Sequence, residues 1–337
     1  MSKKPILKSI SIVFIIGLGI FFSSCAHFWT TVIDPQLIRS NCNQHNAYSY
    51  RLDELPQPIH ELTIPTLLSN EISETSLNIA NAIEVLDLLK EFTELKRRYS
   101  TTGNLEDKIS MLEIKQDIIG KINHSSLEVS AVSSELDCED ERIGQIANYL
   151  AGKEQNTESN LTIGAIIAGA SGAIATGILI GKDKASDYIG LGTGIVEASL
   201  GLMMLFNKRK TELYYDRNAL KEIWEGNKTS PSFPPSVWYY LNYHNPNDKD
   251  HPPIRTQIIE KWMSFGQISD DNPKEKQELV ELYFGKGGEY TAEQLQNRAD
   301  MYDQLKSHIN LMKQDLQVLS IELSSFLSIE DVRGSKT

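Results

Sequence analysis

Residues 291–326, TAEQLQNRADMYDQLKSHINLMKQDLQVLSIELSSF, decide the fold. Large apolar residues recur there at alternating steps of three and four, which is the period of one helix face. They are Tyr302, Leu305, Ile309, Met312, Leu316, Leu319, Leu323 and Phe326. Thr291 and Gln294 have the spacing of a capping box, which starts a helix. We therefore predict a C-terminal helix over 289–330 with a coiled-coil-like seam, which either packs on helices of this chain or binds a protein partner or a second copy.

Two more long helices are predicted upstream, over 69–155. The first begins near Asn70 and repeats apolar residues at helical spacing: Ile79, Ile83, Leu86, Leu89, Phe92 and Leu95. Thr101-Thr102-Gly103-Asn104 ends this pattern, and a second helix follows from about Leu105 to Ala151. Because the connection is short, the two helices should pack antiparallel. The expected fold class is mainly α, with long antiparallel helices forming a bundle or stalk.

The remaining segments are less regular. Residues 25–68 contain four prolines and little periodicity, so we expect a tether or a segment that lies along the surface. Residues 207–288 should form short helices separated by proline-rich loops. The aromatic run Val237-Trp238-Tyr239-Tyr240-Leu241 either forms a binding face or covers a small core, and the core interpretation is favoured.

An apolar, glycine-rich segment lies between the long helices, over 161–206. Residues 161–181 carry no charge, and residues 189–206 carry only Glu197. At about 1.5 Å per residue, each piece approaches the thickness of a bilayer core of about 30 Å. Small residues recur every four positions, which lets two helix backbones approach closely. They are Ala165, Gly169, Ala173, Gly177 and Gly181 in the first piece and Gly190, Gly194 and Ala198 in the second. This pattern predicts a helical hairpin that is inserted in a membrane or buried inside a soluble bundle.

The N-terminus has the features of a secretory signal peptide. Lys3, Lys4 and Lys8 precede an apolar run that ends at Phe22-Ser23-Ser24-Cys25. The run is about 13 residues long, whereas a transmembrane helix needs roughly 20. We therefore expect residues 1–24 to be removed, and an uncleaved N-terminal helix is the less favoured alternative.

Phe22-Ser23-Ser24-Cys25 resembles the lipobox of bacterial lipoproteins. The resemblance implies that Cys25 is acylated and becomes the first residue of the mature chain. Ala26 follows in place of the aspartate that retains such proteins in the inner membrane. The resemblance therefore implies the periplasmic face of the outer membrane, with membrane lipid as a partner.

The glycine-rich segment is similar to that of lipoproteins with a glycine-zipper two-helix membrane domain, which serve envelope integrity rather than catalysis. Lys208-Arg209-Lys210 would remain on the outer side of an inner membrane, against the positive-inside tendency, so the outer membrane is favoured. The order of long helix, apolar hairpin and long helix also resembles α-helical pore-forming toxins. Pore formation is therefore one alternative function, and a soluble partner-binding helical module on a lipid tether is another.

Two cysteines, Cys42 and Cys138, remain beside Cys25. In an oxidising compartment they can form one disulfide that joins the leader to the helical body. Sequence alone leaves two separate thiols as an equal alternative, because it does not fix the distance between the Cα atoms.

Composition and motifs argue against several functions. Without the three lysines of residues 1–24, the formal charge of −12 becomes about −15, so nucleic acid is not an expected partner. Gly190, Gly192 and Gly194 do not complete a dinucleotide loop, and Gly285-Lys286-Gly287-Gly288 lacks the P-loop spacing. Asp248, Asp250 and His251 are better explained as a solvated loop than as metal ligands. We therefore expect a structural or assembly role in the envelope, with no enzymatic activity, cofactor or metal.

Overall fold

The computed structural model describes residues 40–42, 47–178, 199–200, 208–248, 250–269 and 271–328, without the side chains of residue 168 and residues 171–178. The chain divides into two compact units. One comprises Ser40–Ile143, Tyr214–Gly287 and Asn297–Thr337, and we call it the main unit. The other comprises Met1–Arg39, Gly144–Leu213 and Gly288–Gln296, and we call it the second unit.

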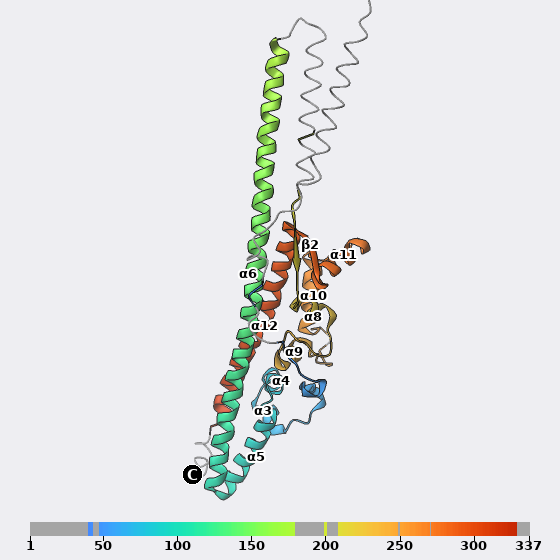
Figure 1. Cartoon of the computed structure of the whole chain (residues 1–337). Helices are drawn as coiled ribbons and strands as arrows, with labels where there is room; N and C mark the ends of the chain where they lie inside the picture. Colours follow the sequence, from blue (N-terminus) through green and yellow to red (C-terminus); the bar gives the residue numbers. More distant parts are fainter. Residues whose placement is uncertain are drawn as a thin grey trace, which may run out of the picture. The chain divides into compact units, whose positions relative to one another are not determined.

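The described residues are mainly helical, as predicted, with one two-stranded sheet (Figure 1). The elements are η2 (Leu52–Glu54), η3 (Ile59–Glu61), α3 (Thr66–Glu71), α4 (Glu74–Ala82), α5 (Leu86–Thr102), α6 (Leu105–Ile178), β1 (Lys210–Tyr214), α8 (Ala219–Glu225), α9 (Pro235–Asn242), α10 (Ile254–Ser264), α11 (Pro273–Phe284), β2 (Gly287–Thr291) and α12 (Ala292–Phe326).

The leader lies along the main unit over its described residues. The backbone N–H of Tyr48 donates to the carbonyl of Pro231, and the Tyr50 hydroxyl accepts from the N–H of Ser230. Ile59 is buried. Residues 47–65 therefore form a segment that lies along the surface of the main unit, which is the second of the two predicted alternatives.

The single helix expected from residue 70 to about 100 is wrong, because three helices occupy this stretch. Ser73 ends the first segment and caps α4, accepting from the N–H of Ser76. Glu84 then adopts φ 59°, the left-handed region that a helix cannot contain. α5 ends at Gly103, whose φ of 67° suits a glycine C-cap. The apolar period continued across the break at Glu84, so periodicity alone could not predict it.

α5 and α6 run antiparallel within the main unit. Arg98 pairs with Asp107 at 2.7 Å, and Lys121 pairs with Glu84 just before α5 at 3.1 Å. From the first pair to the second, the residue number falls on the α5 side, from 98 to 84, and rises on α6, from 107 to 121. The two helices therefore run in opposite directions.

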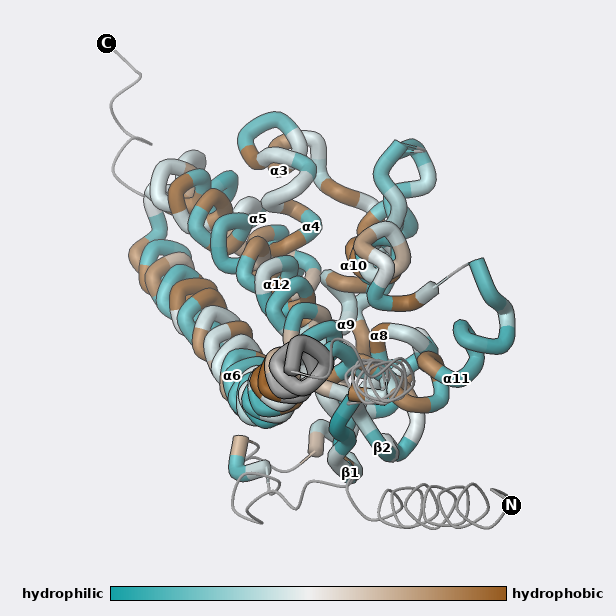
Figure 2. Tube along the Cα trace, turned by 90° about the horizontal axis from the view of Figure 1, so that it is seen from above, coloured by the Kyte–Doolittle hydropathy of each residue, from teal (hydrophilic) through white to brown (hydrophobic). Residues whose placement is uncertain are grey.

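α12 runs antiparallel to the part of α6 that belongs to the main unit. The Ser133 hydroxyl donates to Asn310 at 2.9 Å, and Lys306 pairs with Asp137 at 2.6 Å. Figures 1 and 2 both show α12 alongside α6. All eight predicted seam residues of α12 are buried in the chain, at no more than 3% exposure. Each such side chain contributes about 1.5–3 kcal/mol when it leaves water.

α6 is longer than predicted. We expected a boundary between 155 and 161, but the helix continues from Leu105 to Ile178 without a break. The polar residues 152–160 look like a loop in sequence, yet the Thr157 hydroxyl donates to the carbonyl of Lys153 and the Thr162 hydroxyl to that of Glu158. Residues 152–160 contain no proline and are all half-buried or exposed, so a helix can carry their polar side chains at its surface.

Residues 207–288 form the predicted short helices, but β1 and β2 were not predicted. β1 alternates exposed and buried residues, and Thr211 and Leu213 are buried. At its start, Lys208 pairs with Glu293 and Lys210 with Glu289 within the second unit. Neither strand shows an apolar alternation in its sequence, because β1 buries the polar Thr211 and β2 begins with Gly287-Gly288. The predicted capping box is confirmed, because Thr291 and Gln294 exchange side chain to backbone hydrogen bonds.

Candidate binding site

A candidate site forms in the main unit where the leader crosses the start of α9. The leader is extended here: Leu55 has φ −79° and ψ 142°, and Pro58 has φ −56° and ψ 129°. These values are those of a polyproline II helix. The proline content of Leu55-Pro56-Gln57-Pro58 explains the conformation, because each proline fixes its own φ and restricts the residue before it.

α9 supplies the aromatic wall of the site. Pro235 occupies the first turn, where its missing N–H costs nothing. Trp238 stacks on Phe233 with ring centroids 5.6 Å apart, and its indole N–H donates to the carbonyl of Asn227. Trp238, Tyr239 and Tyr240 are all buried. Most of the surface of these aromatic side chains is therefore buried, as the core interpretation predicts.

Tyr239 joins three segments at the site. Its hydroxyl accepts from the N–H of Ile59 and from the amide of Asn81, and donates to Asn78 at 2.8 Å. The Asn81 amide also donates to the carbonyl of Gln57 at 2.7 Å. The leader is thus fixed to α4 and α9 through one phenol.

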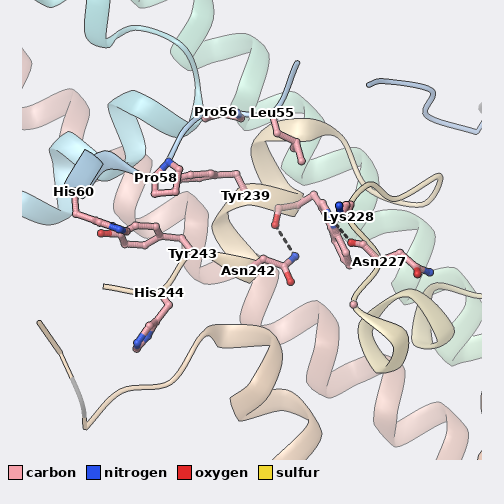
Figure 3. Close-up of a pocket in the computed structure, with 12 residues that line it drawn as sticks. Leu55, Pro56, Pro58, His60, Asn227, Lys228, Tyr239, Asn242, Tyr243 and His244 are labelled. Atoms are coloured by element: carbon pink, nitrogen blue, oxygen red, sulfur yellow. Dashed lines mark hydrogen bonds between the residues drawn. The ribbon is translucent and has the colours of Figure 1, made fainter. Parts of the chain in front are cut away.

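A cavity of about 410 Å³ opens beside this junction (Figure 3). Pro58 lies beside Tyr239, and His60 lies 6.1 Å from Tyr243 between ring centroids. The cavity wall combines prolines, aromatic rings and a few polar side chains. Its residues are Leu55, Pro56, Pro58, His60, Gly226, Asn227, Lys228, Trp238, Tyr239, Asn242, Tyr243 and His244.

The phenols of the site remain protonated at neutral pH. Burial raises the pKa of Tyr239 to about 12, although its hydrogen bonds from Asn81 and Ile59 oppose the shift. Burial and then Glu74 raise the pKa of Tyr243. Neither phenol can act as a general base near neutrality, so these rings offer apolar surface and hydroxyl donors. Such a wall suits binding.

Among the described residues, no group of three His, Cys, Asp or Glu side chains is arranged to hold a metal ion. In the loop considered as a metal site, the carboxylate of Asp248 accepts from the backbone N–H groups of Asp250 and His251. The His251 ring nitrogen lies 3.0 Å from the same carboxylate, and this contact lowers the pKa of Asp248. The Asp248 carboxylate therefore forms its hydrogen bonds within this loop.

The two cysteines other than Cys25 are bonded to each other. Cys42 and Cys138 form a disulfide with a Cα–Cα distance of 5.4 Å. It attaches the start of the described leader to the middle of α6. Cys25 lies outside the described residues, as does the rest of the signal segment.

The glycine-rich hairpin is described only in part. α6 contains Ala165 and Gly169 and, by backbone alone, Ala173 and Gly177. Gly181, Gly190, Gly194 and Ala198 lie outside the described residues. A Cβ on Gly164, which precedes the first stripe residue Ala165, would lie 3.9 Å from Leu200, so α6 approaches the second piece at this point. Within the described ranges, no helix combines the length and the apolar composition that a membrane span requires.

Comparison with known proteins finds no matching family model, no matching curated protein and no matching solved structure.

Proposed function

We propose that the chain is a lipid-anchored bacterial envelope protein with a structural or assembly role. In this proposal Cys25 carries the lipid at the periplasmic face of the outer membrane, and the long helices form a bundle or stalk that bears the glycine-rich hairpin. The observation that carries the proposal is the pairing of Cys42 with Cys138, which leaves Cys25 as the one cysteine available for acylation. Disulfides persist in oxidising compartments, which agrees with the signal-like N-terminus.

Exposed apolar side chains support membrane contact by the hairpin. Ile163, Ile166 and Ile167 are each more than half exposed on α6. Gly164, beside them in sequence, faces Leu200. Isoleucines at the surface of a helix that packs through small residues suit a lipid environment.

Basic residues beside the hairpin support an outer-membrane position. The backbone N–H of Arg209 donates to Glu154, and Lys208 pairs with Glu293. Within the second unit these contacts hold the basic cluster against protein acids. The cluster would thus remain on the same side of the membrane as its partners.

Alkaline carbonate extraction tests both attachments. We expect the unmodified chain to stay with the membrane, and Cys25→Ala to stay there in part through the hairpin. Adding Ile163→Asn, Ile166→Asn and Ile167→Asn to Cys25→Ala should release the chain. Complete release of Cys25→Ala alone would contradict hairpin insertion, and full retention of the fourfold variant would contradict the assignment of these isoleucines to lipid.

The cavity favours a second function, display of a binding module on the lipid tether. The chain's own Pro56 and Pro58 line a wall shared with Tyr239 and Tyr243, so the site suits an extended proline-rich peptide. Titration with an oligoproline peptide should change the fluorescence of Trp238. Tyr243→Ala should weaken this response, whereas Tyr214→Ala, at an exposed ring on β1, should not. No response at millimolar peptide would contradict this function.

A further inference from the structure

The N-terminal part of α6 has two apolar faces. One is buried in the main unit and includes Met111, Ile114 and Ile118. The other points away from that core: Leu105 is 67% exposed, Ile109 49%, Leu112 50% and Ile119 41%. We call these four residues the outer stripe. Isolated exposed leucines are common, but a periodic stripe on one helix indicates a contact surface.

The outer stripe has the spacing of a coiled-coil seam. Its steps of four, three and seven place Leu105, Leu112 and Ile119 at heptad position d and Ile109 at position a. The next a positions are Gln116 and Asn123, which are exposed and polar. A β-branched residue at a with leucine at d favours two strands, and a polar residue at a fixes the register.

We propose that a second copy of this chain docks on the outer stripe, with the two α6 helices parallel. The flanking charges select this partner and direction. Lys108 falls at position g and Glu113 at position e, and g pairs with the following e of the other helix in a parallel coiled coil. Two Lys108–Glu113 ion pairs would therefore form across the symmetry axis. An antiparallel pair would instead place Glu113 near the partner's e-position acids Glu106 and Glu113, with like charges opposed.

The groups required by this pairing are available. Glu113 is exposed and Lys108 is half-buried, so both side chains reach the surface of α6. Gly120, at the next e position, has nothing within 4 Å of an added Cβ, so it leaves room for a neighbouring helix. Figure 2 shows α12 and α5 together on one side of α6.

The chain's own C-terminal tail is a poor occupant for the outer stripe. Residues 329–337, IEDVRGSKT, contain only two large apolar residues, Ile329 and Val332. They cannot match four stripe positions over two heptads. A second copy supplies an identical stripe and opposite charges at the required positions, as two-fold symmetry demands.

Sedimentation of the full chain in detergent micelles tests the dimer. We expect a monomer–dimer equilibrium that Leu112→Glu weakens by at least about tenfold in Kd. Val318→Glu is the matched control, because Val318 on α12 has similar exposure, 44%, and lies off the stripe. A monomer at all accessible concentrations, or equal weakening by both variants, would overturn the proposal.

A charge swap tests the pairing. Lys108→Glu and Glu113→Lys should each weaken the dimer by about two- to fivefold, as expected for exposed ion pairs. The double variant should restore the original Kd. Additive losses in the double variant would overturn the Lys108–Glu113 assignment.

Cysteine crosslinking tests the direction. Leu105→Cys should form a disulfide-linked dimer of the full chain, because position 105 meets its own copy only in the parallel arrangement. Leu311→Cys, an exposed position on α12, should not crosslink. Crosslinking only in a mixture of Leu105→Cys and Ile119→Cys chains would show an antiparallel pair and overturn the proposal.

Discussion

Arg298 is fully buried in the main unit and organises the contacts around it. Its guanidinium lies 3.8 Å from the centroid of the Tyr215 ring and 5.4 Å from that of Tyr302. It donates to the carbonyl of Tyr283 and to the side chain of Asn218. Stacking combined with a planar fork of donors is a property of arginine that lysine lacks.

Arg298→Ala should destabilise the chain by about 3–5 kcal/mol, because it removes two buried hydrogen bonds and the stacking on Tyr215 and opens a cavity. Arg298→Lys should recover only part of this loss. Urea unfolding measures both. Arg97→Ala, which removes an exposed pair with Glu94, is the matched control and should cost less than about 1 kcal/mol. Similar losses at the two positions would contradict the role given to Arg298.

Asp140 should make stability depend on pH. Burial raises its pKa to about 6, and Asp303, Asp137 and Asp300 add to the shift, whereas Lys306 opposes it. The folded chain therefore binds this proton more tightly than the unfolded chain does. The resulting stabilisation is complete below the ordinary carboxyl pKa and is lost as the pH rises through about 6.

Asp140→Asn removes this dependence. The side chain is 26% exposed, so solvent screening reduces the effect to on the order of 1 kcal/mol. Thermal unfolding should show the variant more stable than the unmodified chain near pH 8 and equal to it near pH 4. A difference of the same size at both pH values would contradict the assignment.

At the scale of elements, the disulfide should be the largest single constraint on the leader. It closes a separation of 96 residues, which in the chain-entropy model contributes about 4–5 kcal/mol. Cys42→Ser combined with Cys138→Ser should lower the free energy of unfolding by roughly this amount, as measured in urea. The same loss should follow reduction of the unmodified chain. An unchanged unfolding midpoint would show that the bond does not constrain the chain.

Some elements could be predicted from the sequence. The α12 seam was predicted residue by residue, because an unbroken period of three and four leaves one possible buried face. Within the described residues α6 packs along α12, and a protein partner for the C-terminal helix stays a prediction. The outer stripe of α6 was harder to recognise. Leu105, Ile109 and Leu112 belong to the apolar positions of the helix predicted from Leu105 to Ala151, and sequence alone does not separate two apolar faces on one helix.

The candidate site depends on contacts that are distant in sequence. The aromatic run of α9 is visible in the sequence, but the bond from Ile59 to Tyr239 joins residues separated by 180 positions. Neither periodicity nor turn chemistry predicts such a contact. The left-handed Glu84 is missed for a related reason, because a single unusual backbone conformation changes no residue pattern.

At the scale of the whole molecule, we propose a protein that is held beside a membrane and pairs with a second copy. A tether raises the local concentration of chains, so even a weak α6 interface would be occupied at the surface. Parallel α6 helices also point the same way, which allows both copies to attach to one membrane.

Mass spectrometry of the native protein tests the central claim most directly. We predict a mature chain that begins at Cys25 and carries the added mass of acyl groups on that residue, with Cys42 and Cys138 oxidised. A chain that retains residues 1–24 with an unmodified Cys25 would contradict the lipid anchor.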